Sequence, residues 1–145
     1  MDEGEGRILG VDWGEKRIGL AISDPLGITA QALDTVRYSS LRESIAEVAR
    51  TIRPFKIGRV VIGLPLRLDG SSGTQAQRVR EWGKKLSRTL DLPVVFQDER
   101  LTSQEAERVL LQANLRRRRR RELTDRLAAQ IILQSYLNQV ASGFQ

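Results

Sequence analysis

Three acidic positions of this sequence could carry chemistry together, namely Asp12, the pair Asp98-Glu99, and Asp125. Asp12 interrupts an otherwise apolar run that is typical of a buried strand. Asp98-Glu99 directly follows another apolar run, at the strand end where open α/β sheets place their sites. Asp125 precedes Ala128 and Ala129 by three and four residues, so it heads the apolar stripe of a helix. An acid on a core-facing stripe is costly unless it is paired or metal-bound, which makes these carboxylates candidate metal ligands.

Each acid also has an ordinary explanation when it is taken by itself. Asp125 could be a favourable charge at a helix N-terminus, or could pair with Arg121 or Arg126. Glu99 could be an exposed loop acid before a capped helix that begins at Thr102. A single fold that brings the three positions together explains them jointly, and we prefer that interpretation to coincidence.

The segment around Asp12 predicts a β-hairpin. Gly14-Glu15 has glycine at the first central position, which suits a two-residue type II′ turn and sets Asp12 opposite Arg17. One hairpin face is then apolar and consists of Leu9, Val11, Ile18, Leu20 and Ile22. The other face holds the acid and the base with almost no bulk, since its remaining residues are Gly10, Gly19 and Ala21. Two interpretations fit: the space receives an ion or a phosphate, or Asp12 and Arg17 form a structural pair and the glycines only admit a helix.

The composition restricts the chemistry further, because the chain has no His and no Cys. Their absence removes His-based acid–base catalysis, the Ser-His-Asp and Cys-His nucleophile systems, and the usual zinc ligands. Catalysis must then rest on carboxylates, backbone groups, Arg and Lys, which points to hard ions such as Mg²⁺ or Mn²⁺. No disulfide, signal peptide or membrane-spanning run is recognisable, so we expect a cytoplasmic protein without a membrane partner.

The charge balance favours a polyanionic partner. The chain has 24 Lys and Arg against 18 Asp and Glu, a net charge of +6, and all but four of the cations are Arg. The planar guanidinium of Arg binds two phosphate oxygens at once, so nucleic acid is the expected ligand class. A genome-level bias toward Arg would explain the Arg:Lys ratio, but it explains the net charge less well.

The 145 residues predict a single domain, 1–145, with a flexible N-terminus over 1–6 and a frayed C-terminus over 139–145. After the hairpin we expect strands over 29–37, 58–64 and 93–97, and helices over 41–53, 74–89, from 102 onward, and over 122–140. Ser40 should cap the helix over 41–53, whose apolar stripe is Leu41, Ile45, Val48, Ala49 and Ile52. This order predicts an α/β fold whose mixed sheet has antiparallel strands first, then helix-connected parallel strands, with helices on both faces.

Four motifs in order resemble the bacterial YqgF/RuvX family, and the resemblance covers about residues 7–138. They are Gly10-Val-Asp12-x-Gly14-x-Lys16-Arg17-Ile-Gly19-x-Ala21-x-Ser23-Asp24, Gly63-Leu-Pro65 with Gly70 and Gly73, Asp98-Glu99-Arg100-Leu-Thr102-Ser, and Asp125 followed by Ala128-Ala129-x-Ile-Leu133. Members of that family are described as pre-16S rRNA nucleases and, earlier, as Holliday junction resolvases. The resemblance implies a ribonuclease-H-like fold, similar to that of the resolvase RuvC.

Carried onto this sequence, the family's acidic triad falls on Asp12, Glu99 and Asp125, as catalytic residues and metal ligands. The implied mechanism is phosphodiester hydrolysis assisted by two Mg²⁺ or Mn²⁺ ions. The expected contacts to nucleic acid are Lys16, Arg17, Arg100, Arg116, Arg117, Arg118, Arg119, Arg120 and Arg121. The chain departs from the family pattern in Trp13, which would narrow the site, and in the uninterrupted run of six Arg.

The Arg116–Arg121 run lies between two amphipathic helices, and repulsion between residues four apart disfavours a helix there. We therefore expect a mobile basic connector, or a helix end that frays, which becomes ordered on nucleic-acid phosphates. The stretch over 67–73, before the second helix, could hold a further phosphate or could simply be a mobile loop.

The expected function is that of a metal-dependent nuclease that processes the 5′ end of pre-16S rRNA. A Holliday junction resolvase acting on four-way DNA and a non-catalytic RNA-binding assembly factor are the alternatives. The partners would accordingly be structured RNA or branched DNA, and the protein a monomer or a weak homodimer. ATP-dependent phosphotransfer on this kind of fold needs two such domains around one nucleotide, and the length supplies one.

Overall fold

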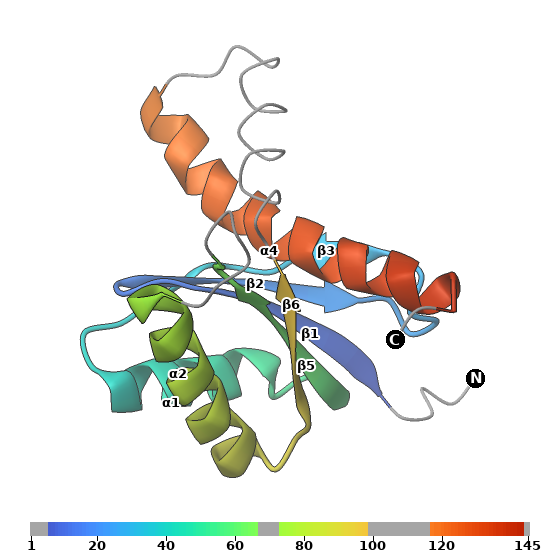
Figure 1. Cartoon of the computed structure of the whole chain (residues 1–145), viewed down its shortest axis with the longest axis horizontal. Coiled ribbons are helices and arrows are strands. Elements are labelled where there is room, and N and C mark those ends of the chain that lie inside the picture. The colour runs from blue at the N-terminus through green and yellow to red at the C-terminus, as the bar shows by residue number, and fades with distance from the viewer. Residues whose placement is uncertain (1–5, 67–72, 99–116, 144–145) are drawn as a thin grey trace.

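The N-terminal hairpin forms as the sequence predicts, but with a longer turn. The computed structural model describes residues 6–66, 73–98 and 117–143 (Figure 1). Strands β1 (Arg7–Trp13) and β2 (Arg17–Ser23) pair antiparallel, with Asp12 opposite Gly19. The predicted register is therefore wrong by two residues, because four residues, 14–17, lie between the paired Trp13 and Ile18 in place of the expected two-residue turn. A shift of two residues keeps every side chain on its predicted face.

The next predicted strand, 29–37, is wrong as a single element and forms two short strands. Strands β3 (Ala30–Ala32) and β4 (Val36–Arg37) both pair with β2. The pairings place three residues, 33–35, opposite two residues of β2, 19–20, so a bulge separates β3 from β4. Because of this bulge, β4 lies beside the end of β2 that follows the hairpin turn.

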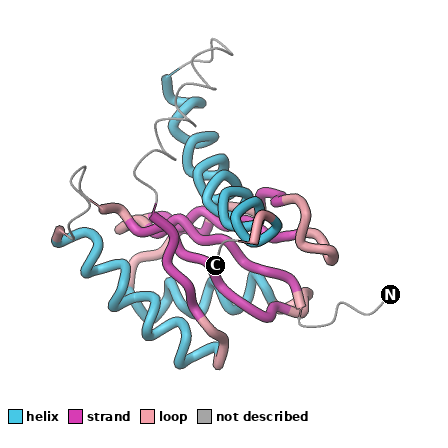
Figure 2. The backbone as a smooth tube through the Cα atoms, turned by 45° about the vertical axis from the view of Figure 1, so that its right-hand side comes forward, coloured by secondary structure: helices cyan, strands magenta, loops and turns pink. Residues whose placement is uncertain are grey.

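The rest of the sheet is parallel, which confirms the predicted mixed α/β fold. Strand β5 (Ile57–Leu64) pairs with β1, and β6 (Val94–Asp98) pairs with β5, giving the order β3-β2-β1-β5-β6. The helices α1 (Leu41–Ile52) and α2 (Thr74–Leu90) make the crossovers and cover one face, as Figure 2 shows. Between them and the sheet lies the larger core cluster, which includes Leu9, Val11, Ile18, Leu20, Val60, Ile62 and Trp82.

The predicted cap of α1 is confirmed, and its predicted buried stripe is corrected at two positions, Leu41 and the half-buried Ala49. The Ser40 hydroxyl accepts a hydrogen bond from the backbone N–H of Glu43 (3.2 Å). Leu41 is 42% exposed, so it does not belong to the buried stripe. Ser44 is fully buried in its place, because its hydroxyl accepts a hydrogen bond from the indole N–H of Trp82 (2.9 Å).

The C-terminal helix α4 (Arg117–Ala141) covers the opposite face of the sheet (Figure 1). It packs through a second cluster that includes Ala21, Val61, Ala129, Ile132 and Leu133. The approach is close at Gly10, where a Cβ would lie 2.7 Å from the Cβ of Leu133. Helix and strand can meet at this distance because Gly10 has no side chain.

Helix α4 is longer than predicted at both ends. Residues 117–121 are helical, so of the two expected alternatives the connector is wrong for them and the helix end remains: Arg has a high helix propensity, and repulsion between residues four apart costs only a few tenths of a kcal/mol. At the other end the helix continues to Ala141, one residue beyond the predicted end, and the fraying expected from residue 139 stays a prediction. Residues 1–5, Arg116 and the helix expected from Thr102 lie outside the described residues, and within the described ranges no helix is long and apolar enough to cross a membrane.

Candidate active site

An open cleft of about 1010 Å³ lies at the end of the sheet where the β1–β2 turn closes. Its lining residues are Asp12, Gly14, Glu15, Lys16, Arg17, Gly19, Arg37, Tyr38 and Ser39. Three of them are cations and two are carboxylates, of which Glu15 is ion-paired with Arg78 of α2. The cleft therefore combines one half-buried carboxylate, that of Asp12, with a cationic wall.

The two glycines nearest Asp12 on its sheet face have different surroundings. Asp12 lies on the same sheet face as Gly10, two residues earlier, and α4 covers Gly10 closely. Gly19, the partner of Asp12 across the hairpin, instead lines the cleft. One glycine thus admits the helix, and the other leaves space beside the carboxylate.

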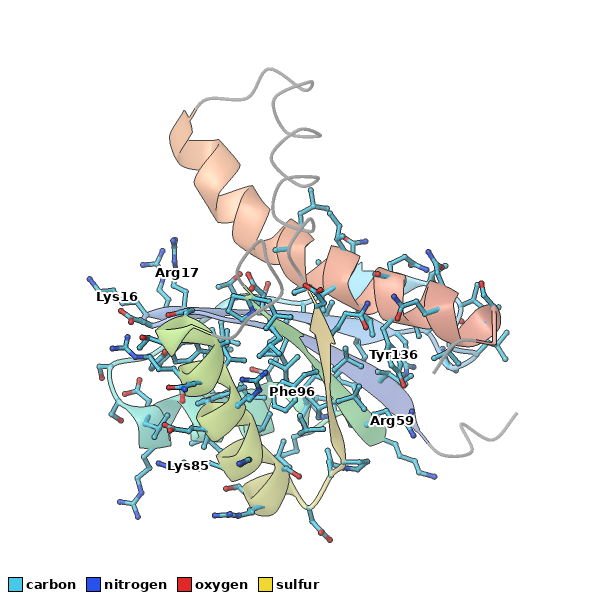
Figure 3. All side chains as sticks on the ribbon, in the orientation of Figure 1. Lys16, Arg17, Arg59, Lys85, Phe96 and Tyr136 are labelled. Carbon is cyan, nitrogen blue, oxygen red and sulfur yellow. The ribbon has the colours of Figure 1, made fainter. Side chains whose placement is uncertain are left out.

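The predicted pairing of Asp12 with Arg17 is wrong in register, although both residues reach the same cleft. Arg17 is the Cα partner of Arg37 on β4, and it lies diagonal to Asp12. Lys16 and Arg17 project from the hairpin end on the side of the sheet that α4 covers, away from α1 and α2 (Figure 3). The structure therefore brings together three of the predicted site residues, Asp12, Lys16 and Arg17.

Trp13 does not narrow the site. Its side chain packs against the core cluster on the α1 and α2 face, as strand alternation requires for the neighbour of Asp12. The predicted narrowing is thus wrong, and the space beside Asp12 is bordered by Gly14 and Gly19.

Strand alternation at the end of β6 places Asp98 on the sheet face opposite the one that carries Asp12. Phe96 packs against Gly83 of α2, where a glycine Cβ would lie 2.9 Å from its ring. Gln97 lies on the other face, because its side-chain amide donates to the hydroxyl of Ser135 on α4 (3.2 Å). Asp98 follows in alternation on the face of Phe96. Glu99 and Arg100 lie outside the described residues.

Asp125 belongs to α4, one helical turn before Ala129. The helix runs antiparallel to β1, because its earlier residues Ala129 and Leu133 lie against Gly10 and its later residue Tyr136 lies near the level of Ile8. That level follows from a hydrogen bond: the guanidinium of Arg59, the β5 partner of Ile8, donates to the Tyr136 hydroxyl (2.6 Å; Figure 3). Positions before Ala129 therefore lie toward the end of β1 that carries Asp12. The structure describes the backbone of α4 at Asp125 and at Arg117–Arg121, and leaves their side chains untested as site residues.

The last two residues of the first family motif have a structural role. The Ser23 hydroxyl accepts a hydrogen bond from the backbone N–H of Ile8 (2.8 Å). The Asp24 carboxylate accepts hydrogen bonds from the backbone N–H groups of Thr29 (2.8 Å), Ile28 (2.7 Å) and Leu26 (3.2 Å). These bonds, with that of Thr29 foremost, hold the pKa of Asp24 below its ordinary value of 3.8. Asp24 therefore fixes the loop between β2 and β3.

Two cleft residues, Arg37 and Tyr38, were missed by the sequence analysis. The Tyr38 hydroxyl donates to the carbonyl of Gly14, which fastens β4 to the hairpin turn. Burial, and to a smaller extent the negative charge of Glu15, raises the pKa of Tyr38 above its ordinary 10.0, so the phenol keeps this proton. No local sequence signal could have found them, because their place in the cleft depends on the pairing of β4 with β2.

The site fits a divalent metal ion in its chemistry. Asp12 offers hard carboxylate oxygens, which Mg²⁺ and Mn²⁺ prefer. Gly14 and Gly19 add no side chain to the space beside it, so a hydrated ion has room in the open cleft.

Comparison with known proteins decides the family. The family model described as "RuvX: Holliday junction resolvase" matches residues 6–139. The chain belongs to the RuvX family. The match spans both described faces of the sheet, from β1 to α4, and includes the three predicted acids.

Two relatives of this RuvX-family chain carry the name "Putative pre-16S rRNA nuclease". The protein from Syntrophus aciditrophicus is 47% identical over 135 residues, which cover 93% of this chain and 90% of the relative. The protein from Moorella thermoacetica is 48% identical over 137 residues, covering 94% and 98%. Among solved structures, Thermus thermophilus RuvC in complex with a Holliday junction has a TM-score of 0.54 at 16% identity, covering 94% of this chain and 96% of that one. This likeness confirms the ribonuclease-H-like fold expected from the sequence.

Proposed function

We propose that this RuvX-family chain is a metal-dependent nuclease that hydrolyses phosphodiester bonds in the 5′ region of pre-16S rRNA in the cytoplasm. The observation that carries the proposal is the cleft in which Asp12 meets a wall of Lys16, Arg17 and Arg37. A carboxylate suits a metal ion and guanidinium groups suit phosphate, so one cleft offers both halves of a phosphodiester-hydrolysing site. The names of relatives nearly half identical to this chain supply the substrate.

In this proposal Asp12, Glu99 and Asp125 hold two Mg²⁺ or Mn²⁺ ions. Three carboxylates close together repel one another, so their charge is neutralised either by bound cations or by protonation. When bound, such ions activate water and stabilise the charge that develops on the scissile phosphate and the leaving oxygen.

The cations of the chain bind and orient the substrate. Lys16 and Arg17 bind phosphate at the cleft, while Arg100 and the run Arg116–Arg121 contact the backbone on either side of the acids. Tyr38 holds the turn that carries Lys16, because its hydroxyl bonds to Gly14 and its backbone N–H donates to the Lys16 carbonyl (3.3 Å). A fixed turn keeps these cations aimed at the cleft without reorganisation when substrate binds.

The proposal is tested by cleavage of a transcript that spans the 5′ end of 16S rRNA, with Mg²⁺ or Mn²⁺. Asp12→Asn keeps the shape of the side chain and removes its charge, so hydrolysis should fall at least about 100-fold while the circular dichroism spectrum and the unfolding temperature stay close to wild type. Isothermal titration with Mn²⁺ should show weaker metal binding in the same variant. Wild-type cleavage by Asp12→Asn would disprove the site.

A four-way DNA junction serves as the competing substrate, since the family model is described as a Holliday junction resolvase. Faster metal-dependent cleavage of the junction than of the transcript would make resolution the function. Binding of the transcript with no cleavage under either metal would instead indicate a non-catalytic assembly factor. End trimming needs only a monomer, whereas symmetric junction cleavage favours a dimer, so sedimentation of the enzyme–substrate complex adds an independent check.

A further inference from the structure

Two arginines stand directly opposite each other in the wall of the cleft. In the antiparallel pairing of β2 with β4, Arg17 is the Cα partner of Arg37, and both residues line the cleft that contains Asp12. Directly opposed residues have Cβ atoms about 4.5–5.5 Å apart, and like charges in this position destabilise the strand pairing. Lys16 adds a third cation to the same wall. An anionic ligand bound in the cleft would offset this repulsion.

The fold itself makes no visible use of the Arg37 side chain. Arg37 is exposed, and within the described ranges its guanidinium has no hydrogen bond or ion pair. The second carboxylate of the cleft, that of Glu15, is ion-paired with Arg78 on α2. The N–H donors of Arg37 are thus available to a ligand, and their planar fork matches two oxygens of a phosphate.

The backbone holds Arg37 in place from both sides. Its predecessor Val36 is buried and pairs with Ile18 of β2. Its successor Tyr38 bonds to the hairpin turn through both its backbone N–H and its hydroxyl. A side chain on such a fixed element is placed for binding before the ligand arrives, which lowers the entropic cost of the contact.

The position of Arg37 separates it from the acid. Strand β2 lies between β1, which carries Asp12, and β4, which carries Arg37. Two strand spacings amount to roughly 10 Å between the backbones, so the arginine pair is centred to one side of Asp12. The pair is therefore suited to a neighbouring phosphate of the same nucleic-acid strand.

We propose that Arg37 and Arg17 jointly bind a backbone phosphate of the nucleic-acid substrate that neighbours the cleaved phosphodiester. The proposal rests on the proposed nuclease function and adds Arg37 as a positioning residue. Because the contact exists in the bound substrate and in the transition state alike, its removal should raise KM and leave kcat nearly unchanged. Being a contact to phosphate, it should act on RNA and DNA alike.

The test compares Arg37→Gln with Arg88→Gln, which removes the same charge from an exposed position on α2, on the other side of the sheet. Binding of a fluorescein-labelled 16S 5′ transcript and of a four-way DNA junction is measured by anisotropy over a series of salt concentrations. Both measurements use the Asp12→Asn background without divalent metal, so they do not depend on catalysis. Arg37→Gln should weaken binding about tenfold and flatten the slope of log K against log salt by about 0.7–0.9, with little change for Arg88→Gln.

Arg37→Lys separates geometry from charge, since it should keep the salt slope but bind more weakly than wild type. The unfolding temperature of Arg37→Gln should equal or exceed that of wild type, because one of two opposed like charges is gone. Equal affinities and slopes for Arg37→Gln and Arg88→Gln would overturn the proposal. A loss confined to kcat at saturating substrate would also overturn it, by assigning Arg37 to the cleaved phosphate. If no substrate is cleaved by the wild type but the binding difference persists, the nuclease function fails and the phosphate contact stands.

Discussion

At the end of β6, strand alternation separates the two neighbouring acids of the sequence. Phe96 lies on the α2 face and Gln97 on the α4 face, so Asp98 points away from the face that carries Asp12. A carboxylate on the far face cannot share a metal ion with Asp12. We therefore expect Glu99, the next residue in the alternation, to be the metal ligand.

The two acids can be compared directly by substitution. Glu99→Gln should lower cleavage of the 16S 5′ transcript about 100-fold or more, because it removes a charged ligand. Asp98→Asn should lower cleavage at most about tenfold, which is the effect expected of a residue that supports the metal ligands without binding the metal. Single-turnover cleavage over a Mn²⁺ series measures both, and a larger loss in Asp98→Asn would reverse the assignment.

At the scale of elements, the contact of α4 with β1 decides whether the acids can meet. Gly10 lets the helix approach so closely that an added Cβ would lie 2.7 Å from the Cβ of Leu133 and 3.2 Å from the Ala129 carbonyl oxygen. Both of these atoms belong to the helix backbone or directly adjoin it, so they cannot rotate away. Since α4 also carries Asp125, its distance from the sheet sets the reach of that acid toward Asp12.

Gly10→Ala should therefore displace α4 and impair the site. We expect a loss of about 1–3 kcal/mol in the free energy of unfolding, typical of overpacking, together with reduced cleavage. Val61→Ala is the matched control, because Val61 is fully buried in the same cluster but its truncation leaves a cavity and does not push the helix outward. Urea unfolding and cleavage rates distinguish them; if both variants lose activity in proportion to stability, the helix approach has no special role.

At the scale of the whole molecule, one group of cations lies on the side of the sheet that carries Asp12. Lys16 and Arg17 project on the side that α4 covers, and the Arg-rich beginning of α4 extends on that same side (Figures 1 and 3). The net charge of +6 makes long-range attraction to nucleic acid favourable, and this arrangement would direct it to the face with Asp12.

Replacing Arg117–Arg121 by Gln should weaken binding of RNA and DNA alike. The slope against log salt should flatten by about 0.7–0.9 for each phosphate that the protein no longer neutralises. Gln preserves helix propensity, so α4 should remain folded. The control removes five exposed cations from the α1 and α2 side of the sheet, namely Arg42, Arg53, Lys84, Lys85 and Arg88. Anisotropy titrations compare the two proteins at equal net charge; equal slopes would mean that the run acts only through total charge.

The sequence by itself determined the order of the described elements except for the division of 29–37 into β3 and β4, the faces of the hairpin, and the chemistry left open by the missing His and Cys. These follow from local patterns: apolar alternation in β1, the Ser40 cap of α1, and the apolar stripe of α4. The role of Glu99 as a metal ligand remains a prediction, because it rests on strand alternation and on the family resemblance.

Only the tertiary structure decided the hairpin register, the bulge between β3 and β4, and the opposition of Arg17 and Arg37. Four residues, 14–17, lie between the paired Trp13 and Ile18, whereas the local Gly14-Glu15 pattern indicates a two-residue turn, so the local pattern does not fix the register. Strand pairing then brings Arg37, twenty residues farther along the chain, beside Arg17. Residues distant in sequence meet only through such non-local pairing, so the place of Arg37 in the cationic wall could not be read from spacing, whereas Asp12, Lys16 and Arg17 could.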